Sequence, residues 1–353
     1  MGRRSIVAGF ALLACTAALA PGVQAQKATL DVPANKKWQH AQTGLIVPQA
    51  PAGLPRTEIS ALGEGELDIA VQFGDVDRTQ ATLYLFRPAL MSVPLWFDRV
   101  ETQILQRDAY GTAAPTGTPS SFAIPGGTAA SALRRFYTPS KPPYAATGVA
   151  VLPLGEWLVV LRISSVEQAP AQLDATLSAL IAGLGWPAHA ADAPPAVPIQ
   201  PCATTLAYDR KAKMQKPDMT AGLLGSLLAM AAANKEKTDQ ADKAAPEAAP
   251  ATLCREGTGT PTMGTYRAES RSPDGYIIAL GDAGRTISVH PELQLDQKKK
   301  PGFAVTLATL DKTFTFPAFD RLPAPDMVMQ AIARTQPVSS VDRGSKTINI
   351  RPQ

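Results

Sequence analysis

Alternating apolar and polar positions predict a β-hairpin near residue 70. Apolar side chains occupy every second position of one stretch, at Leu67, Ile69, Val71 and Phe73. This is the period of a strand with one buried face. A second β-prone stretch, 82–86, follows across the polar residues 75–80. We therefore expect two antiparallel strands joined by a polar turn.

Apolar residues at helical spacing predict two helices in the same segment. The first is expected over 93–109, with Ser92 as its N-cap and Gly111 just beyond its end. Its apolar face should pack against the protein, and its other face should be solvated. That polar face carries Asp98, Arg99, Glu101, Gln103 and Arg107. The second helix is expected over 170–184, where leucines form one stripe.

Four further strands are expected nearby, at 121–124, 132–137, 148–152 and 156–164. The last of them is apolar on both faces for much of its length, so we expect it at the centre of a sheet. Hairpins interrupted by one helix and closed by another predict an α+β domain over 38–187, built on a mainly antiparallel sheet.

The rest of the chain predicts a second α+β domain, also with a mainly antiparallel sheet. Residues 188–201 are rich in proline and alanine, which is typical of a linker. The second domain, 202–353, should begin with an apolar-striped helix over 217–235. Residues 235–251 are rich in charged residues, alanine and proline, and we expect a mobile insertion there. Its later elements are expected as strands at 265–269, 276–280, 286–289, 303–310, 313–316 and 347–350, a hairpin turn at 281–284 and a helix at 325–334.

The first 25 residues have the three parts of a secretory signal peptide. Arg3 and Arg4 precede an apolar run over 6–20, and small residues lead to a cut between Ala25 and Gln26. The apolar run is shorter than the roughly 20 residues that span a bilayer, and no later stretch is longer. We expect an exported, periplasmic or secreted chain with no transmembrane span after cleavage.

A lipid-anchored product is the alternative to this cut. Residues 12–15, Leu-Leu-Ala-Cys, resemble the lipobox of bacterial lipoproteins, in which Cys15 would become the acylated first residue. The apolar run continues past Cys15, and an ordinary cleavage site follows it, so the soluble product is preferred.

Two of the three cysteines, Cys202 and Cys254, would remain after cleavage. An even pair in an exported chain predicts a disulfide. Closing a loop of this length would stabilise the fold by roughly 4 kcal/mol. Loss of Arg3 and Arg4 lowers the net charge from +4 to +2, and such a small surplus does not indicate nucleic-acid binding.

No motif in the chain indicates catalysis, a cofactor or a metal. The three histidines, His40, His189 and His290, are far apart in the sequence, and zinc-binding spacings are absent. The nucleophile elbow, the Ser-x-x-Lys pair and the phosphate-binding loop are absent too. The proline-rich stretch between Tyr137 and Tyr144 is interpreted as a rigid connection, with a binding loop as the alternative.

The order of elements in 38–187 resembles one known family. With Gly44-Leu45-Ile46-Val47-Pro48 at its start and 157–163 followed by the leucine-rich helix, it is similar to the PsbP-like or DcrB-like α/β/α sandwich of exported proteins. The resemblance implies a non-enzymatic envelope protein or accessory subunit.

Three functions are compatible with these observations. The leading hypothesis is an exported binding or accessory protein that recognises an envelope protein or a small ligand and has no evident catalysis. The first alternative is an envelope enzyme whose residues meet only in three dimensions, at the domain junction. The second is a structural envelope component that docks through helix 217–235.

Overall fold

The computed structural model describes residues 27–188, 193–216, 252–268, 275–292, 302–345 and 347–350. Several predictions concern residues outside these ranges. They are the signal peptide with its cut between Ala25 and Gln26, the lipobox at Cys15, the helix over 217–235 and the insertion over 235–251.

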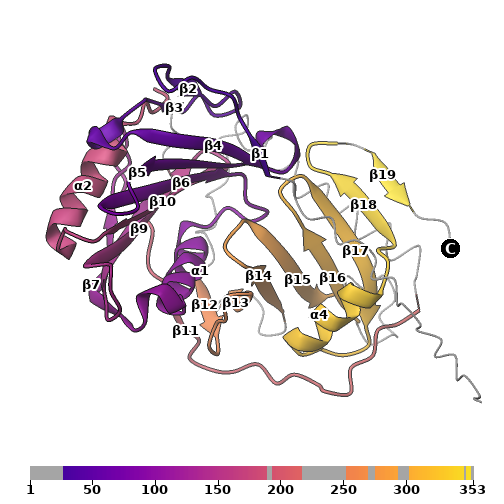
Figure 1. Cartoon of the computed structure of the whole chain (residues 1–353). Coiled ribbons are helices and arrows are strands. Elements are labelled where there is room, and N and C mark those ends of the chain that lie inside the picture. The colour runs from indigo at the N-terminus through magenta and orange to yellow at the C-terminus, as the bar shows by residue number, and fades with distance from the viewer. Residues whose placement is uncertain are drawn as a thin grey trace, which may run out of the picture.

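The first half of the chain forms an eight-stranded sheet in which all neighbours are antiparallel (Figure 1). In spatial order its strands are β1 (Lys27–Thr29), β4 (Arg56–Leu62), β5 (Asp68–Gly74), β6 (Thr79–Phe86), β10 (Trp157–Ser165), β9 (Ala146–Leu154), β8 (Ala132–Pro139) and β7 (Ala113–Phe122). A separate two-stranded ribbon joins β2 (Trp38–Gln39) to β3 (Ile46–Val47).

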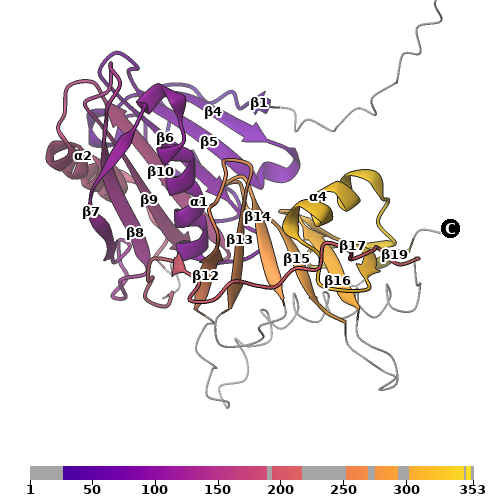
Figure 2. The same cartoon turned by 90° about the horizontal axis from the view of Figure 1, so that it is seen from below.

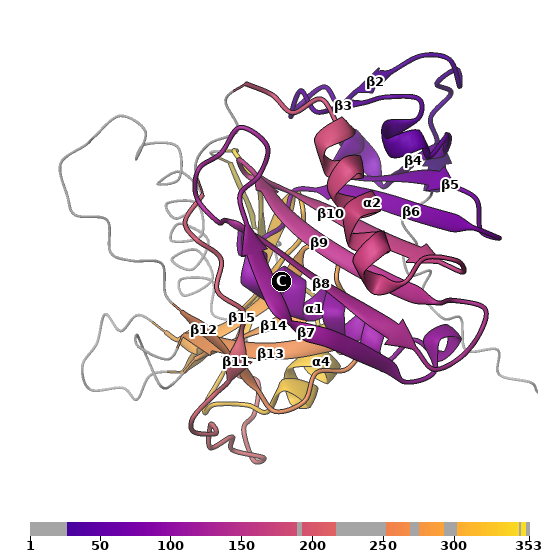
Figure 3. The ribbon, with the colours of Figure 1, turned by 90° about the vertical axis from the view of Figure 1, so that its left-hand side faces the viewer.

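Helices α1 (Val93–Leu105) and α2 (Pro170–Gly183) lie on opposite faces of this sheet. Figure 3 shows α2 across the outer face. Alternate residues of β10 divide between the two cores, with Val159 and Leu161 facing α2 and Leu158 and Val160 facing α1. The strand is thus buried on both sides because each face of the sheet is covered by a helix.

The second half of the chain forms a nine-stranded sheet (Figure 2). Its strands, in spatial order, are β11 (Gln200–Pro201), β12 (Leu253–Glu256), β13 (Met263–Ala268), β14 (Tyr276–Leu280), β15 (Arg285–Pro291), β16 (Phe303–Ala308), β17 (Lys312–Phe319), β18 (Ser339–Asp342) and β19 (Ile348–Ile350). All neighbours are antiparallel except β11 and β12. Helix α4 (Pro325–Arg334) packs on one face through Val328.

These sheets confirm the α+β class and the mainly antiparallel pairing. The hairpin β5–β6, the central position of β10, the turn at 281–284 and the helix over 325–334 all occur as predicted. The first helix ends at Leu105 rather than at residue 109, and a short 3-10 turn then buries Tyr110. Strand β7 is longer than predicted, because its prolines and mostly exposed edge position give it no apolar alternation.

The two sheets share a core around α1. Tyr266 and Ala279 of the second sheet belong to the same apolar cluster as Trp96 and Val100 of α1. Ala196, within the predicted linker, is buried in that cluster too, and its N–H donates to Ala130 O over 2.9 Å. This part of the 188–201 segment therefore packs between the sheets rather than only connecting them.

Within the described ranges, none of the helices has both the length and the apolar character needed to cross a bilayer.

Candidate functional site

Helix α1 lies between the two sheets and carries two carboxylates one turn apart, Asp98 and Glu101 (Figures 1 and 2). The prediction that its polar face is solvated is wrong within the helix, although Arg107, beyond its end, is exposed. Asp98 is 5% exposed and Arg99 is completely buried. The polar face is covered because the second sheet packs on it, and the partners that satisfy its charges come from residues far along the chain.

Glu101 faces the first sheet. Its Oε1 accepts hydrogen bonds from Arg135 Nη1 over 2.7 Å and from Tyr137 OH over 2.9 Å, both on β8. The same guanidinium holds the neighbouring edge strand, because Arg135 Nε and Nη2 donate to Gly117 O over 2.9 and 2.6 Å. Burial raises the pKa of Tyr137, so the phenol stays a donor at all ordinary pH values.

Asp98 repeats this arrangement toward the second sheet. Its Oδ2 accepts from Tyr266 OH over 2.6 Å, and its Oδ1 accepts from Arg255 Nη1 over 2.5 Å. Burial raises the pKa of Asp98, while Tyr266 and Arg255 act in the opposite direction. The pKa of Tyr266 is raised by burial as well. Each carboxylate of α1 is therefore matched by one tyrosine and one arginine.

Arg99 fixes the position of α1 against the second sheet. Its Nε donates to Gly281 O over 2.7 Å, and its Nη2 donates to Thr260 O over 2.6 Å and to Pro261 O over 3.1 Å. Gln103 adds a hydrogen bond to Pro261 O over 2.6 Å. These bonds to backbone carbonyls hold the helix rigidly between the sheets.

The two acid–tyrosine–arginine groups border a hollow of about 260 Å³, which we call the junction hollow. The charged groups at its surface are Asp98, Glu101, Arg135 and Arg255. Its apolar walls come from Phe97, Pro119 and the extended segment 198–201. The volume is slightly below the ~300 Å³ at which typical ligand pockets begin, so only a small molecule or the end of a larger one would fit.

The chemistry of the junction hollow favours binding over catalysis. Both oxygens of Asp98 accept strong donors, and Glu101 accepts two on Oε1, so each carboxylate is held in its charged form by an arginine and a tyrosine. Arg255 has spare donors. In the described part of the chain, Nη1 is its only nitrogen with an acceptor, and its buried Nε has none.

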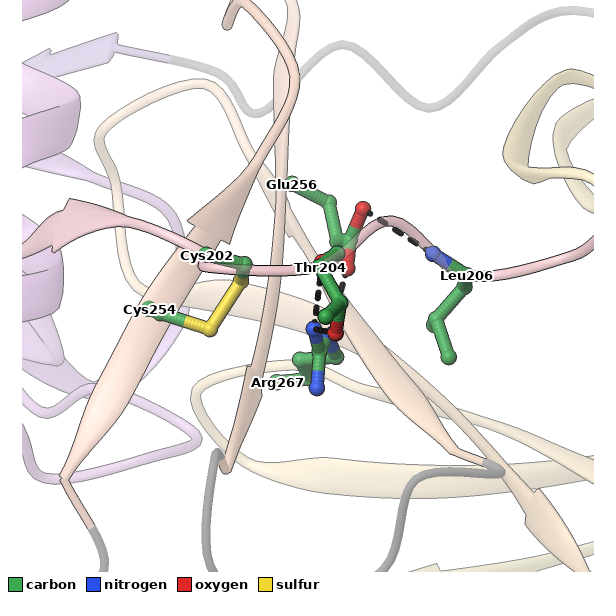
Figure 4. Close-up of a disulfide and its surroundings, with 6 residues drawn as sticks. All are labelled: Cys202, Thr204, Leu206, Cys254, Glu256 and Arg267. Carbon is green, nitrogen blue, oxygen red and sulfur yellow. Dashed lines mark hydrogen bonds and ion pairs between the residues drawn. A yellow bond between two sulfur atoms is a disulfide. The ribbon is translucent and has the colours of Figure 1, made fainter.

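The predicted disulfide between Cys202 and Cys254 is present, with Cα atoms 4.8 Å apart (Figure 4). It joins the residue that follows β11 to β12, and Cys202 N–H donates to Arg255 O over 2.9 Å. Because Pro201 and Arg255 both line the junction hollow, the bridge fixes one of its walls.

The chain that follows the bridge is held by a buried ion pair (Figure 4). Arg267 Nε donates to Glu256 Oε1 over 2.5 Å, and both side chains are about 5% exposed. Arg267 Nη2 also reaches Thr204 Oγ1 over 2.9 Å, and Leu206 N–H donates to Glu256 Oε2 over 3.4 Å.

The histidines do not meet. His40 is buried against Trp157 with ring centroids 4.7 Å apart, and its Nε2 lies 3.1 Å from Glu66 O. Burial lowers its pKa. His290 is exposed, and His189 lies outside the described residues. Across the residues that the structure places, no three His, Cys, Asp or Glu side chains come close enough to hold a metal ion.

The proline-rich stretch between Tyr137 and Tyr144 is fixed at both ends. Tyr137 OH donates to Glu101, and Tyr144 OH accepts from Gln80 Nε2 over 2.9 Å. These contacts agree with a rigid connection between β8 and β9. Nothing in the sequence around Tyr137 indicates that it contacts α1.

Comparisons with protein-family models, curated proteins and solved structures found no match for the chain.

Proposed function

We propose that this is an exported binding protein without catalysis, and that its ligand occupies the junction hollow. The signal-like N-terminus supports export, and so does a disulfide, which is typical of oxidising compartments. Strand β1 begins at Lys27, so a cut after Ala25 would leave the first sheet intact. A PsbP-like origin of the first sheet and its helices remains part of this proposal.

The observation that carries the proposal is that Arg255 has a guanidinium nitrogen, Nη2, with no acceptor among the described residues. Asp98 pairs with this guanidinium through Nη1 and Nε is buried, which leaves Nη2 for another acceptor. The N–H groups of a guanidinium are charge-assisted donors to the oxygens of a carboxylate. The apolar walls of Pro119 and residues 198–201 would accommodate a short hydrocarbon body. A small carboxylate is therefore the ligand class that fits the junction hollow best.

An enzyme assembled at the junction of the two sheets is the second candidate. Asp98 supports it, because burial raises the pKa of this carboxyl inside the same hollow, as catalytic acids often require. Both of its oxygens accept hydrogen bonds, so binding remains the preferred proposal. The third candidate, docking through helix 217–235, concerns residues outside the described ranges.

The test is calorimetric titration of purified protein beginning at Gln26 with a panel of small mono- and dicarboxylates. Arg255→Lys keeps the positive charge beside Asp98 but removes the Nη2 donor. We expect at least tenfold weaker binding in this variant and unchanged binding in the control Arg210→Lys, an exposed arginine that pairs with Asp326 over 2.7 Å. Equal affinity in R255K, or turnover of a bound compound, would contradict the proposal.

A further inference from the structure

A second hollow lies between the first sheet and the turn joining β14 to β15. It has a volume of about 150 Å³ and shares no lining residue with the junction hollow. The first sheet contributes Asp68, Tyr84, Phe86 and Arg162, and the turn contributes Asp282. We call it the Asp68 hollow.

The turn over this hollow is firmly attached. Arg162 Nη2 forms an ion pair with Asp282 Oδ2, and Ala89 N–H donates to Gly284 O over 2.7 Å. Gly284 has a φ of +81°, and a Cβ atom there would lie 2.9 Å from Phe86 Cδ2. Only glycine allows the turn to approach β6 this closely. The turn between β14 and β15 is thus held in place over the hollow as firmly as the strands of the first sheet that line its other side.

Asp68 is the unexplained group in this hollow. Only 6% of this residue's surface is exposed. Among the residues that the structure describes, no side chain or backbone group forms a hydrogen bond or an ion pair with its carboxyl, and Arg285 attracts its charge only through space. A buried carboxylate without donors is costly, and native proteins rarely keep one without a reason.

We propose that the Asp68 hollow binds a small primary amine, with the Asp68 carboxylate accepting the ammonium group. The ammonium would supply the donors and the opposite charge that the protein does not provide. The walls formed by Leu62, Val100 and Val160 would contact a hydrocarbon body. An apolar cavity of about 150 Å³ holds a molecule of the size of benzene, which sets the size of the amine.

The charges around the hollow allow a single ammonium group. Arg162 lines the hollow and forms an ion pair with Asp282. Arg285 of β15 is the cation whose charge acts on Asp68, and Tyr84 of β6 is the remaining titratable group in the lining. Helix α1 contributes only the apolar Val100 to the lining.

The binding should depend on pH in a defined direction. Burial raises the pKa of Asp68 to about 6, and Arg285 opposes this shift. Only the ionised carboxylate attracts an ammonium group, so amine affinity should rise as the pH increases through 6 and level off above 7. A neutral ligand of the same size would lack this dependence.

The proposal is tested by titrating the protein with n-butylamine at pH 7.5 and pH 5.0, with n-butanol and butyrate as probes of matched size. Asp68→Asn removes the charge, and Asp77→Asn, in an exposed turn, is the matched control. We expect saturable amine binding in the wild type and D77N, at least tenfold weaker binding in D68N, and at least tenfold weaker binding at pH 5.0.

Three results would overturn the proposal. These are equal amine affinity in D68N, n-butanol binding as tightly as n-butylamine, and no saturable binding at all, as expected of a hollow that holds only water. If D68N failed to fold, the pH dependence of the wild type would decide alone. No residue of the junction hollow is involved, so the outcome is independent of the proposed function.

Discussion

At the scale of single residues, the most consequential feature is a pair of buried acids whose donors are all supplied by distant residues. Asp98 receives one hydrogen bond from Tyr266 and one from Arg255, 168 and 157 residues away. A hydrogen bond to a charged acceptor contributes more than one to a carbonyl. The hydroxyl of Tyr266 should therefore contribute more to the free energy of unfolding than the hydroxyl of a buried tyrosine that donates to a neutral carbonyl.

Replacing Tyr266 by phenylalanine should lower the free energy of unfolding by about 1.5–3 kcal/mol, because the buried Asp98 loses a donor. Tyr276 is the matched control, since it is also buried but donates to the neutral Pro323 O over 2.8 Å. Tyr276→Phe should cost about 0.5–1.5 kcal/mol. Urea unfolding of both variants is the measurement. An equal or smaller loss in Y266F would show that Asp98 does not need this donor.

Asp68 should give the protein a characteristic pH dependence. Its pKa rises from 3.8 to about 6 on folding, so the folded state holds this proton more tightly than the unfolded state. The stability that the protonated Asp68 adds to the folded protein is therefore complete below pH 4 and is lost as the pH rises through 6. This difference in pKa between the two states corresponds to roughly 3 kcal/mol.

The comparison of wild type with Asp68→Asn isolates this group. The difference in urea-unfolding free energy between the two should change by roughly 3 kcal/mol between pH 4 and pH 7, with D68N relatively more stable at pH 7. His40, whose pKa is lowered by burial, destabilises both proteins equally as the pH falls and cancels from the difference. A difference that does not vary with pH would mean that Asp68 titrates normally.

At the scale of elements, helix α1 shows what the sequence could and could not predict. Its start was predictable, because Ser92 caps Leu95 N–H over 3.3 Å and apolar residues recur at helical spacing. The burial of its polar face was not, because Asp98, Arg99 and Glu101 have the composition of a solvated surface. The local pattern contains no information about β8, β12 and β13, which supply the partners.

The same reasoning applies to the two hollows and to the strands. Hairpins such as β5–β6 follow from residues within 20 positions, so periodicity is sufficient to predict them. The junction hollow combines residues between Phe97 and Arg255, and no spacing rule connects them. The bridge between Cys202 and Cys254 was predictable despite its span, because they are the only cysteines outside the predicted signal peptide.

Arg99 should be the residue on α1 that contributes most to holding the sheets together. Arg99→Ala leaves Thr260 O and Gly281 O without their side-chain donor and Pro261 O with Gln103 alone, and we expect a loss of about 3–5 kcal/mol. Arg107, exposed just past the end of α1, stacks 5.2 Å from the Tyr110 ring, and Arg107→Ala should cost about 1 kcal/mol or less. Similar melting temperatures for R99A and R107A would refute this role.

At the scale of the whole molecule, the two sheets should unfold together. They share the apolar cluster around Trp96, and α1 is bonded to both of them. Breaking either sheet away would expose Asp98, Arg99 and the apolar cluster at once. The predicted linker 188–201 therefore separates two segments of the sequence but not two independently stable units, because Ala196 is part of the core that the sheets share.

Thermal unfolding followed by tryptophan fluorescence and by far-ultraviolet circular dichroism should give one coincident transition. Trp96 reports on the junction, and Trp157 reports on the core beneath α2. A Trp96→Phe variant would assign the fluorescence change to one of the two regions. Two resolved transitions, with Trp157 changing separately from Trp96, would mean that the sheets are independent units.

The central claim is that the junction hollow binds a small carboxylate, and a crystal structure with the tightest compound from the panel tests it most directly. We predict a carboxylate oxygen about 2.7–2.9 Å from Nη2 of Arg255, with the hydrocarbon body against Pro119 and residues 198–201. A hollow that contains only water under saturating ligand, or a ligand bound elsewhere on the molecule, would contradict the account.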